Sequence, residues 1–297
     1  MRPFSVNIRG QLHTFSQPQV MGILNVTPDS FYDGSRTPRS LPDAVARRAE
    51  KLLEEGADLI DIGGYSTRPG ADDVSPDEEL RRLQTGLEAV RKLSADIPVS
   101  VDTFRASVAR EAVGSLGADI INDVSGGLID SGIYRVAAEL HAPYILMHMR
   151  GTPSNMQQHT DYSSYGGVTA GVAAELKQAI SKLNLEGVAD IIIDPGFGFS
   201  KTAAQNYELM RELPQLAMLL GELPMLVGIS RKSMIYKPLD TTPARALPGT
   251  TALNTLALER GAAILRVHDV AEAVQVRDVM QLFGSPSLCD KKPTKHD

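Results

Sequence analysis

Three residues of this chain carry side chains suited to recognising a flat, hydrogen-bonding ring: Asp102, Asn122 and Asp194. Each ends a short apolar segment at a separate place in the sequence. A carboxylate accepts two parallel hydrogen bonds, and an amide offers a donor and an acceptor. Held together, they can bind a heterocycle with adjacent N–H groups, such as a 2-amino-4-oxopyrimidine. A single strand-end aspartate more often caps the following helix, and that explanation stays open for Asp61 and Asp123.

A second set of candidates is cationic. Lys232 stands in the run Ser230–Ser233, and Arg266 and His268 lie two residues apart within an apolar segment. Two residues so spaced on a strand point the same way. Arginine can hold two phosphate oxygens at once through charge-assisted hydrogen bonds. We therefore expect an anion site, because the apolar neighbours of Arg266 and His268 disfavour a solvated basic cluster.

Two loops add further candidates. The segment from Asn25 to Ser35 places oxygen-bearing side chains around Phe31. Such a loop can hold a hard cation such as Mg²⁺ or close an aromatic ring over a ligand, and an ordinary polar loop is the alternative. The segment Gly63–Gly70 allows close backbone approach to a ligand and carries one cation, Arg68, although glycines also serve plain turns.

The elements that position these residues are eight short, mostly apolar segments, each separated from the next by enough chain for a helix. They are Val20–Asn25, Leu59–Gly63, Val99–Asp102, Ile120–Asp123, Tyr144–His148, Ile191–Asp194, Met225–Ser230 and Ile264–His268. Segments of this kind are typical of parallel strands buried on both faces. Eight strand–helix units predict an α/β fold, the (β/α)₈ TIM barrel, whose active site lies at the carboxyl ends of the strands. An open doubly wound sheet is the alternative, but no glycine fingerprint follows the first strand.

Residues 1–19 are predicted to form an N-terminal extension with a β-hairpin around Arg9–Gly10, which can plug the amino-terminal end of the barrel. The barrel is expected to span residues 20–283, and residues 284–297 are expected to form a disordered tail. Capping boxes are predicted at Ser75 with Glu78 and at Asp269 with Glu272, each starting a helix.

Composition excludes several classes of protein. The 297 residues carry a net charge of −6, which argues against general nucleic-acid binding. A single cysteine, Cys289, rules out an internal disulfide framework and a cysteine-based zinc site. No apolar run approaches the length of about 18 residues expected of a membrane span. We therefore expect a cytoplasmic enzyme that does not associate with membranes.

Seven ordered motifs at barrel spacing resemble those of the dihydropteroate synthases, pterin-binding (β/α)₈ enzymes of folate biosynthesis. The resemblance covers about residues 18–283. The motifs occupy Gly22–Phe31, Asp61–Gly70, Ser100–Thr103, Ile121–Asp123, Asp194–Phe199, Ser230–Ser233 and Arg266–Val270.

The resemblance implies joining of 6-hydroxymethyl-7,8-dihydropterin diphosphate to p-aminobenzoate, with release of diphosphate. It also implies a homodimer and a target for sulfonamides. By this resemblance the pterin ring is held by Asp102, Asn122, Asp194 and Lys232, and the diphosphate by Arg266 and His268 with support from Asp61. Asn25 would bind Mg²⁺. The surroundings of p-aminobenzoate would be Phe31, Thr67, Arg68, Pro69, Phe199 and Ser233. Among these, Asp102, Asp194, Lys232, Arg266 and His268 are the expected catalytic residues.

One residue departs from the family pattern: Tyr65 stands where a glutamate is usual in the Asp61–Gly70 motif. Because the following residues are intact, we expect activity to survive. Two other functions remain open, a catalytically silent pterin-binding paralogue and a methyltetrahydrofolate-binding methyltransferase. Such a methyltransferase does not need the motifs Ser230–Ser233 and Arg266–Val270, because it has no diphosphate to bind.

Overall fold

The computed structural model describes residues 3–27, 40–65 and 74–285. Within them, parallel strands form an eight-stranded sheet in the order β8-β7-β6-β5-β4-β3-β10-β9. A parallel bridge between Ile193 and Met225 joins the two ends of this order, so the sheet closes into the predicted barrel. The strands are β3 (Gln19–Asn25), β4 (Leu59–Gly63), β5 (Val99–Asp102), β6 (Ile120–Asp123), β7 (Tyr144–Met147), β8 (Ile191–Asp194), β9 (Leu226–Val227) and β10 (Ile264–Val267).

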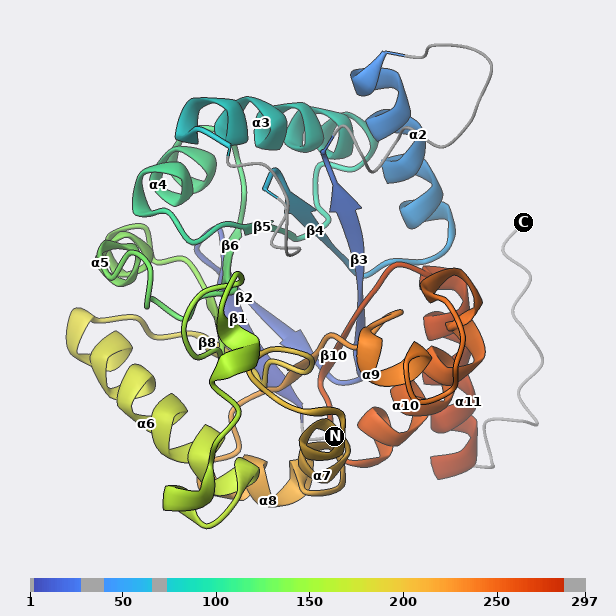
Figure 1. Cartoon of the computed structure of the whole chain (residues 1–297). Coiled ribbons are helices and arrows are strands. Elements are labelled where there is room, and N and C mark those ends of the chain that lie inside the picture. Colours follow the sequence, from blue (N-terminus) through green and yellow to red (C-terminus); the bar gives the residue numbers. More distant parts are fainter. Residues whose placement is uncertain (1–2, 28–39, 66–73, 286–297) are drawn as a thin grey trace.

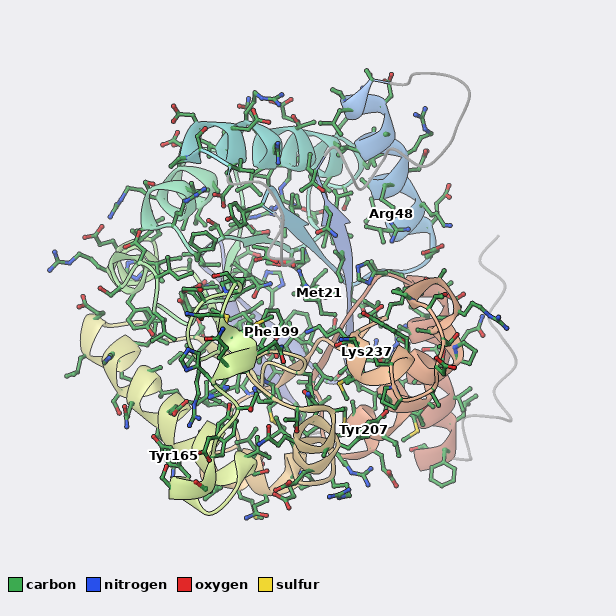
Figure 2. All side chains as sticks on the ribbon, in the orientation of Figure 1. Met21, Arg48, Tyr165, Phe199, Tyr207 and Lys237 are labelled. Atoms are coloured by element: carbon green, nitrogen blue, oxygen red, sulfur yellow. The ribbon has the colours of Figure 1, made fainter. Side chains whose placement is uncertain are left out.

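Helices surround the strands on the outside, as Figure 1 shows. They are α2 (Leu41–Glu54), α3 (Pro76–Leu93), α4 (Ala106–Gly114), α5 (Gly132–Glu139), α6 (Val168–Glu186), α7 (Ala203–Arg211), α8 (Leu213–Leu219), α9 (Ser233–Tyr236), α10 (Leu247–Glu259) and α11 (Val270–Gly284). In Figure 2, Met21 and Phe199 lie near the centre of the ring, whereas Tyr165 and Tyr207 lie over outer helices. None of the described helices is long and apolar enough to cross a membrane.

The predicted N-terminal hairpin is confirmed: β1 (Phe4–Ile8) pairs antiparallel with β2 (Gln11–Phe15). Its two-residue turn places Arg9 at φ +52° and Gly10 at φ +77°, the left-handed conformation that such turns require. The side chains of Val6 and Ile8 are buried against residues from the starts of the barrel strands, including Met21 and Leu59. The hairpin therefore closes the amino-terminal end of the barrel and leaves the carboxyl end for the candidate site.

The two predicted capping boxes have different outcomes. At α3, the Ser75 hydroxyl accepts the backbone N–H of Glu78, which is one half of the predicted box, while the Glu78 carboxylate pairs with Arg81 and Arg82. At α11, Asp269 occupies the position before the helix but makes no side-chain cap, so the second prediction is wrong. Its carboxylate instead accepts two hydrogen bonds of 2.8 Å from Arg231. A guanidinium offers stronger, charge-assisted hydrogen bonds than a backbone N–H does, which explains the difference.

The packing of the hairpin leads to a test of its role in stability. Replacing Ile8 by Ala should lower the free energy of unfolding by about 2–5 kcal/mol, because Ile8 is fully buried beneath the barrel. Urea unfolding followed by circular dichroism measures this. The control is Leu12→Ala in the same hairpin, since Leu12 is 72% exposed. Equal effects of the two substitutions would contradict the proposed plug.

Candidate active site

Arg266 links two carboxylates at the carboxyl end of the barrel. Its Nε donates to Asp61 Oδ2 at 2.7 Å, and its Nη2 donates to Asp102 Oδ2 at 2.9 Å. Asp61 is fully buried and also accepts hydrogen bonds from Ser100 Oγ at 2.5 Å and from Asn122 Nδ2 at 3.2 Å. Asp61 therefore holds site residues in place, and helix capping does not explain it.

The register of the parallel strands places Asn25, Asp102 and Asn122 at the same level of the barrel. Asn25 pairs with Gly63, Gly63 with Asp102, and Asp102 with Asn122 on four adjacent strands. A Cβ at Gly63 would lie 3.3 Å from Asn25 Oδ1 and 4.0 Å from Asp102 Oδ2. The missing side chain at Gly63 thus leaves the Asn25 amide and the Asp102 carboxylate facing each other across β4.

Sharing of one guanidinium by two carboxylates has an electrostatic consequence. Burial raises the pKa of Asp102 to about 7, and the negative charge of Asp61 adds to this effect. The positive charge of Arg266 opposes it but does not cancel it. Asp102 is therefore poised to lose or gain a proton near neutral pH, as desolvated carboxyl groups beside other carboxylates do.

Asp194 and Lys232 form a second pair of opposite charges. Asp194 Oδ1 accepts the backbone N–H of Gly196 at 2.8 Å, while burial raises the pKa of this carboxyl group. Lys232 Nζ donates to the carbonyl of Phe197 at 2.6 Å and lies 4.6 Å from the centroid of the Phe199 ring. Burial lowers the pKa of Lys232 to about 8, although the Asp194 carboxylate favours its charged form.

The two pairs lie at the same end of the barrel. A Cβ at Gly228 would lie 3.9 Å from Asp194 Oδ2 and 3.8 Å from the Cβ of Arg266. Asp194 and Arg266 therefore flank the same glycine, and their charges also interact directly. This arrangement can bind a ligand that has N–H donors on one part and negative charge on another.

The remaining candidates of the basic motifs border this group. His268 Nδ1 lies 3.0 Å from Ser230 Oγ, a contact between the loops after β10 and β9. The Arg231–Asp269 ion pair joins the same two loops. Ser233 is the first residue of α9, directly after Lys232. The sequence did not single out Ser230 and Asp269 for these contacts, because their partners lie almost 40 residues away.

Several sequence candidates fall outside the described residues. They are Phe31, Thr67, Arg68 and Pro69, and residues 286–297 of the predicted tail lie outside as well. The described residues contain no group of three or more His, Cys, Asp or Glu side chains that could hold a metal ion. Asn25 is thus the metal candidate whose position is known.

The structure gives separate roles to three further residues near the site. Asp123 accepts the backbone N–H groups of Ser125 and Gly127 and the hydroxyl of Tyr144, so its carboxylate shapes the loop after β6 and does not cap α5, which begins at Gly132. His148 is a core histidine within a polar network. Tyr65, the departure from the family pattern, packs edge-on against Phe104 with ring centroids 5.2 Å apart.

Known proteins match this chain over most of its length. The family described as pterin binding enzyme matches residues 21–268. The dihydropteroate synthase of Synechocystis sp. is 48% identical over 264 residues, covering 86% of this chain and 87% of the relative. The enzyme of that name from Escherichia coli is 43% identical over 268 residues, covering 90% and 92%.

Among solved structures, Xanthomonas albilineans dihydropteroate synthase with 4-aminobenzoic acid superposes with a TM-score of 0.84 at 41% identity, covering 95% of this chain and 98% of the other. The fold is shared over almost the whole length of both chains. The chain belongs to the pterin-binding enzyme family and, within it, to the dihydropteroate synthases.

Proposed function

We propose that this chain condenses 6-hydroxymethyl-7,8-dihydropterin diphosphate with p-aminobenzoate to give 7,8-dihydropteroate and diphosphate. The observation that carries the proposal is the convergence of buried and half-buried acceptors with half-buried cations at one end of the barrel. Asp194 and Arg266 flank Gly228, and Arg266 extends the group to Asp102. A relative crystallised with 4-aminobenzoic acid supports the same substrate.

The pterin ring is assigned to Asp102, Asn122, Asp194 and Lys232. Carboxylates match the N–H groups of the ring, and the lysine ammonium and the amide match its acceptor atoms. The buried position of Asp194 and Asn122, each no more than 5% exposed, makes these hydrogen bonds selective. A ring that lacked a donor would leave a buried carboxylate unpaired, at a cost of about 1–3 kcal/mol.

The departing diphosphate is assigned to Arg266 and His268, with Asp61 fixing the guanidinium. A guanidinium carries five N–H donors, so contacts with Asp61 and Asp102 leave donors for phosphate oxygens. Positive charge placed where negative charge develops lowers the barrier for breaking the C–O bond. Rigid support from Asp61 keeps the cation in place without reorganisation during the reaction.

Asn25 fits a role in holding Mg²⁺. Its amide oxygen lies beside Gly63, on the strand level of Asp102, and amide and phosphate oxygens are ligands that Mg²⁺ accepts. Mg²⁺ bound through one or two protein ligands keeps substrate phosphates in its coordination shell. When bound, the ion would supply charge neutralisation for the leaving group.

We assign p-aminobenzoate to Phe199 and Ser233, together with Phe31, Thr67, Arg68 and Pro69, which lie outside the described residues. Phe199 belongs to an apolar cluster with Phe104 and Met147 beside the proposed pterin position. An aromatic amine is neutral and nucleophilic at pH 7. The chain therefore needs no strong base, and its residues act on orientation and on the leaving group.

We also propose a homodimer formed through the outer face of α11. Val279 is 61% exposed and Phe283 is 81% exposed on this helix, one turn apart. Leu256 of the neighbouring α10 is 38% exposed. Exposed apolar side chains that gather on one face indicate a contact surface.

A cytoplasmic location is proposed because reduced pterins oxidise easily and the single cysteine suits a reducing compartment.

Turnover with the three components tests the reaction. The purified chain with pterin diphosphate, p-aminobenzoate and Mg²⁺ should release diphosphate, measured with a coupled enzymatic assay.

The variant Asp194→Asn should lose at least about tenfold in pterin affinity, because an amide N–H would face the ring donors. The matched control is Asp77→Asn on the exposed start of α3. Pterin binding without diphosphate release by the wild-type chain would instead indicate a silent paralogue.

Affinity for 6-hydroxymethyl-7,8-dihydropterin should depend on pH with a maximum between about 7 and 8. Below this range Asp102 gains a proton and loses its acceptor role, since its pKa is about 7. Above it Lys232 loses a proton, since its pKa is about 8. Titration calorimetry from pH 5.5 to 9.5 measures both limbs. Asp102→Asn should lack the acidic limb, and a flat wild-type profile would refute the assignment.

The dimer has its own test. The double variant Val279→Arg, Phe283→Arg should convert the dimer to a monomer in light scattering, because two cations would be buried at the contact. Leu185→Arg is the control, as Leu185 is 87% exposed on α6. A wild-type monomer, or a variant that stays dimeric, would show that this face is not the interface.

A further inference from the structure

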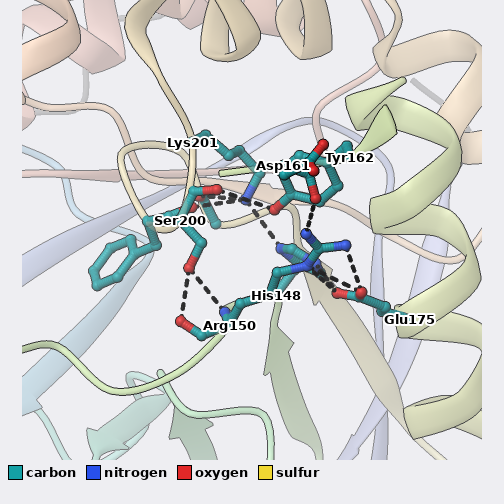
Figure 3. A network of polar contacts seen from close by, with 9 residues as sticks. His148, Arg150, Asp161, Tyr162, Glu175, Ser200 and Lys201 are labelled. Carbon is teal, nitrogen blue, oxygen red and sulfur yellow. Dashed lines mark hydrogen bonds and ion pairs between the residues drawn. The ribbon is translucent and has the colours of Figure 1, made fainter. Parts of the chain in front are cut away.

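A lysine behind the proposed pterin site is almost completely removed from solvent. Lys201 is 2% exposed and lies near the end of the loop between β8 and α7. Its Nζ donates to the carbonyls of Gly196 at 2.9 Å and Phe199 at 3.0 Å and lies 3.0 Å from His148 Nδ1. An ammonium group has three N–H donors, so these acceptors satisfy it fully. Figure 3 shows the contacts.

The contacts with Lys201 continue into a chain of polar groups. Because Lys201 donates to His148 Nδ1, the histidine proton lies on Nε2 and is donated to Glu175 at 2.8 Å. Glu175 also accepts hydrogen bonds from Arg150, including one of 2.7 Å from Nη2. Burial lowers the pKa of His148 to about 4, so the histidine stays neutral as this pattern requires.

The loop that surrounds Lys201 is held by side-chain contacts, from Asp194 to the Gly196 N–H and from Asn206 to the Gly198 N–H, as well as by backbone hydrogen bonding. Gly196 has φ +70°, and a Cβ there would lie 2.0 Å from the carbonyl oxygen of His148. Ser200 also lies in the left-handed region, at φ +51°. Two of the loop carbonyls turn inward to the ammonium. Burial lowers the pKa of Lys201 to about 7, although the Asp194 carboxylate favours its charged form. An unpaired buried ammonium would be very costly, so the inward carbonyls stabilise the cation and the cation holds them in place.

The same loop carries groups of the proposed site. Asp194 begins it, and the Asp194 carboxylate interacts with the charge of Lys201. The Phe197 carbonyl accepts from Lys232, and the Phe199 ring lies against the same ammonium. A change in the loop would therefore displace an acceptor, a carbonyl and a ring together.

We infer that Lys201 is a positioning residue whose buried ammonium orders the Asp194–Ser200 loop and so fixes Asp194 and Lys232 toward the pterin ring. Lys201 touches neither substrate in this proposal. The inference rests on the proposed function for its consequence, while the order of the loop can be tested without any ligand.

The first test compares Lys201→Met with Asp119→Asn. Asp119 is a buried carboxylate paired with Arg9 and Arg91 near the amino-terminal end of the barrel, so its loss perturbs a buried ionic cluster away from the site. Lys201→Met should weaken binding of 6-hydroxymethyl-7,8-dihydropterin at least tenfold. Asp119→Asn should leave it within twofold, whatever the two melting temperatures are. Binding by Lys201→Met within twofold of wild type, or losses in both variants that follow stability, would overturn the inference.

Rescue separates a missing cation from a missing side chain. In Lys201→Ala, added n-propylammonium should restore pterin affinity, whereas n-propanol of similar size should not. Rescue by both additives alike would overturn the inference. If neither Lys201 variant folds by circular dichroism, Glu175→Gln takes their place. It keeps the side-chain shape, and unchanged pterin affinity in this variant would count against the network.

Hydrogen exchange gives a readout that does not depend on the proposed function. Without ligand, amides of residues 196–199 should exchange faster in Lys201→Met than in wild type, with α7 unchanged. Equal exchange would overturn the inference. If the wild-type chain fails to bind the pterin while this difference persists, the proposed function is wrong and the ordering role of Lys201 stands.

Discussion

The guanidinium of Arg266 lies between the carboxylates of Asp61 and Asp102, which come from strands two and three places away in the closed sheet. The cluster holds two carboxyl groups for one positive charge at the carboxyl end of the barrel, and the pKa of Asp102 is raised to about 7. Buried ion pairs contribute little to stability and can reduce it. Stability therefore does not explain this cluster, whereas the proposed role of these residues in holding a charged, hydrogen-bonding ligand would.

Partial compensation of one charged group by another also describes the rest of the site. Asp194 lies opposite Lys232, and behind the Asp194 loop lies Lys201 with its carbonyls and His148. Each buried charge has a partner that partly compensates it, and several keep pKa values near neutrality. A substrate with N–H donors and a diphosphate would complete these interactions. Groups fixed before the substrate arrives need no reorganisation during the reaction.

Much of the fold could be predicted because its signals are local. Apolar segments such as Ile191–Asp194 predict buried parallel strands, and Arg9–Gly10 predicts the hairpin turn. The cap at Asp269 could not be predicted correctly, because the competing partner Arg231 lies 38 residues earlier. Local patterns do not show which distant cation reaches a carboxylate.

The sequence by itself determined the strand ends at which Asp102, Asn122 and Asp194 stand, since β-strand periodicity and chain order are written locally. Only the tertiary structure decided that Asp61 turns inward beneath Arg266 and that Lys201 lies buried behind the Asp194 loop. Both outcomes depend on closure of the barrel. Closure brings groups that are far apart in the chain within 3 Å of each other and removes the water that would otherwise solvate them.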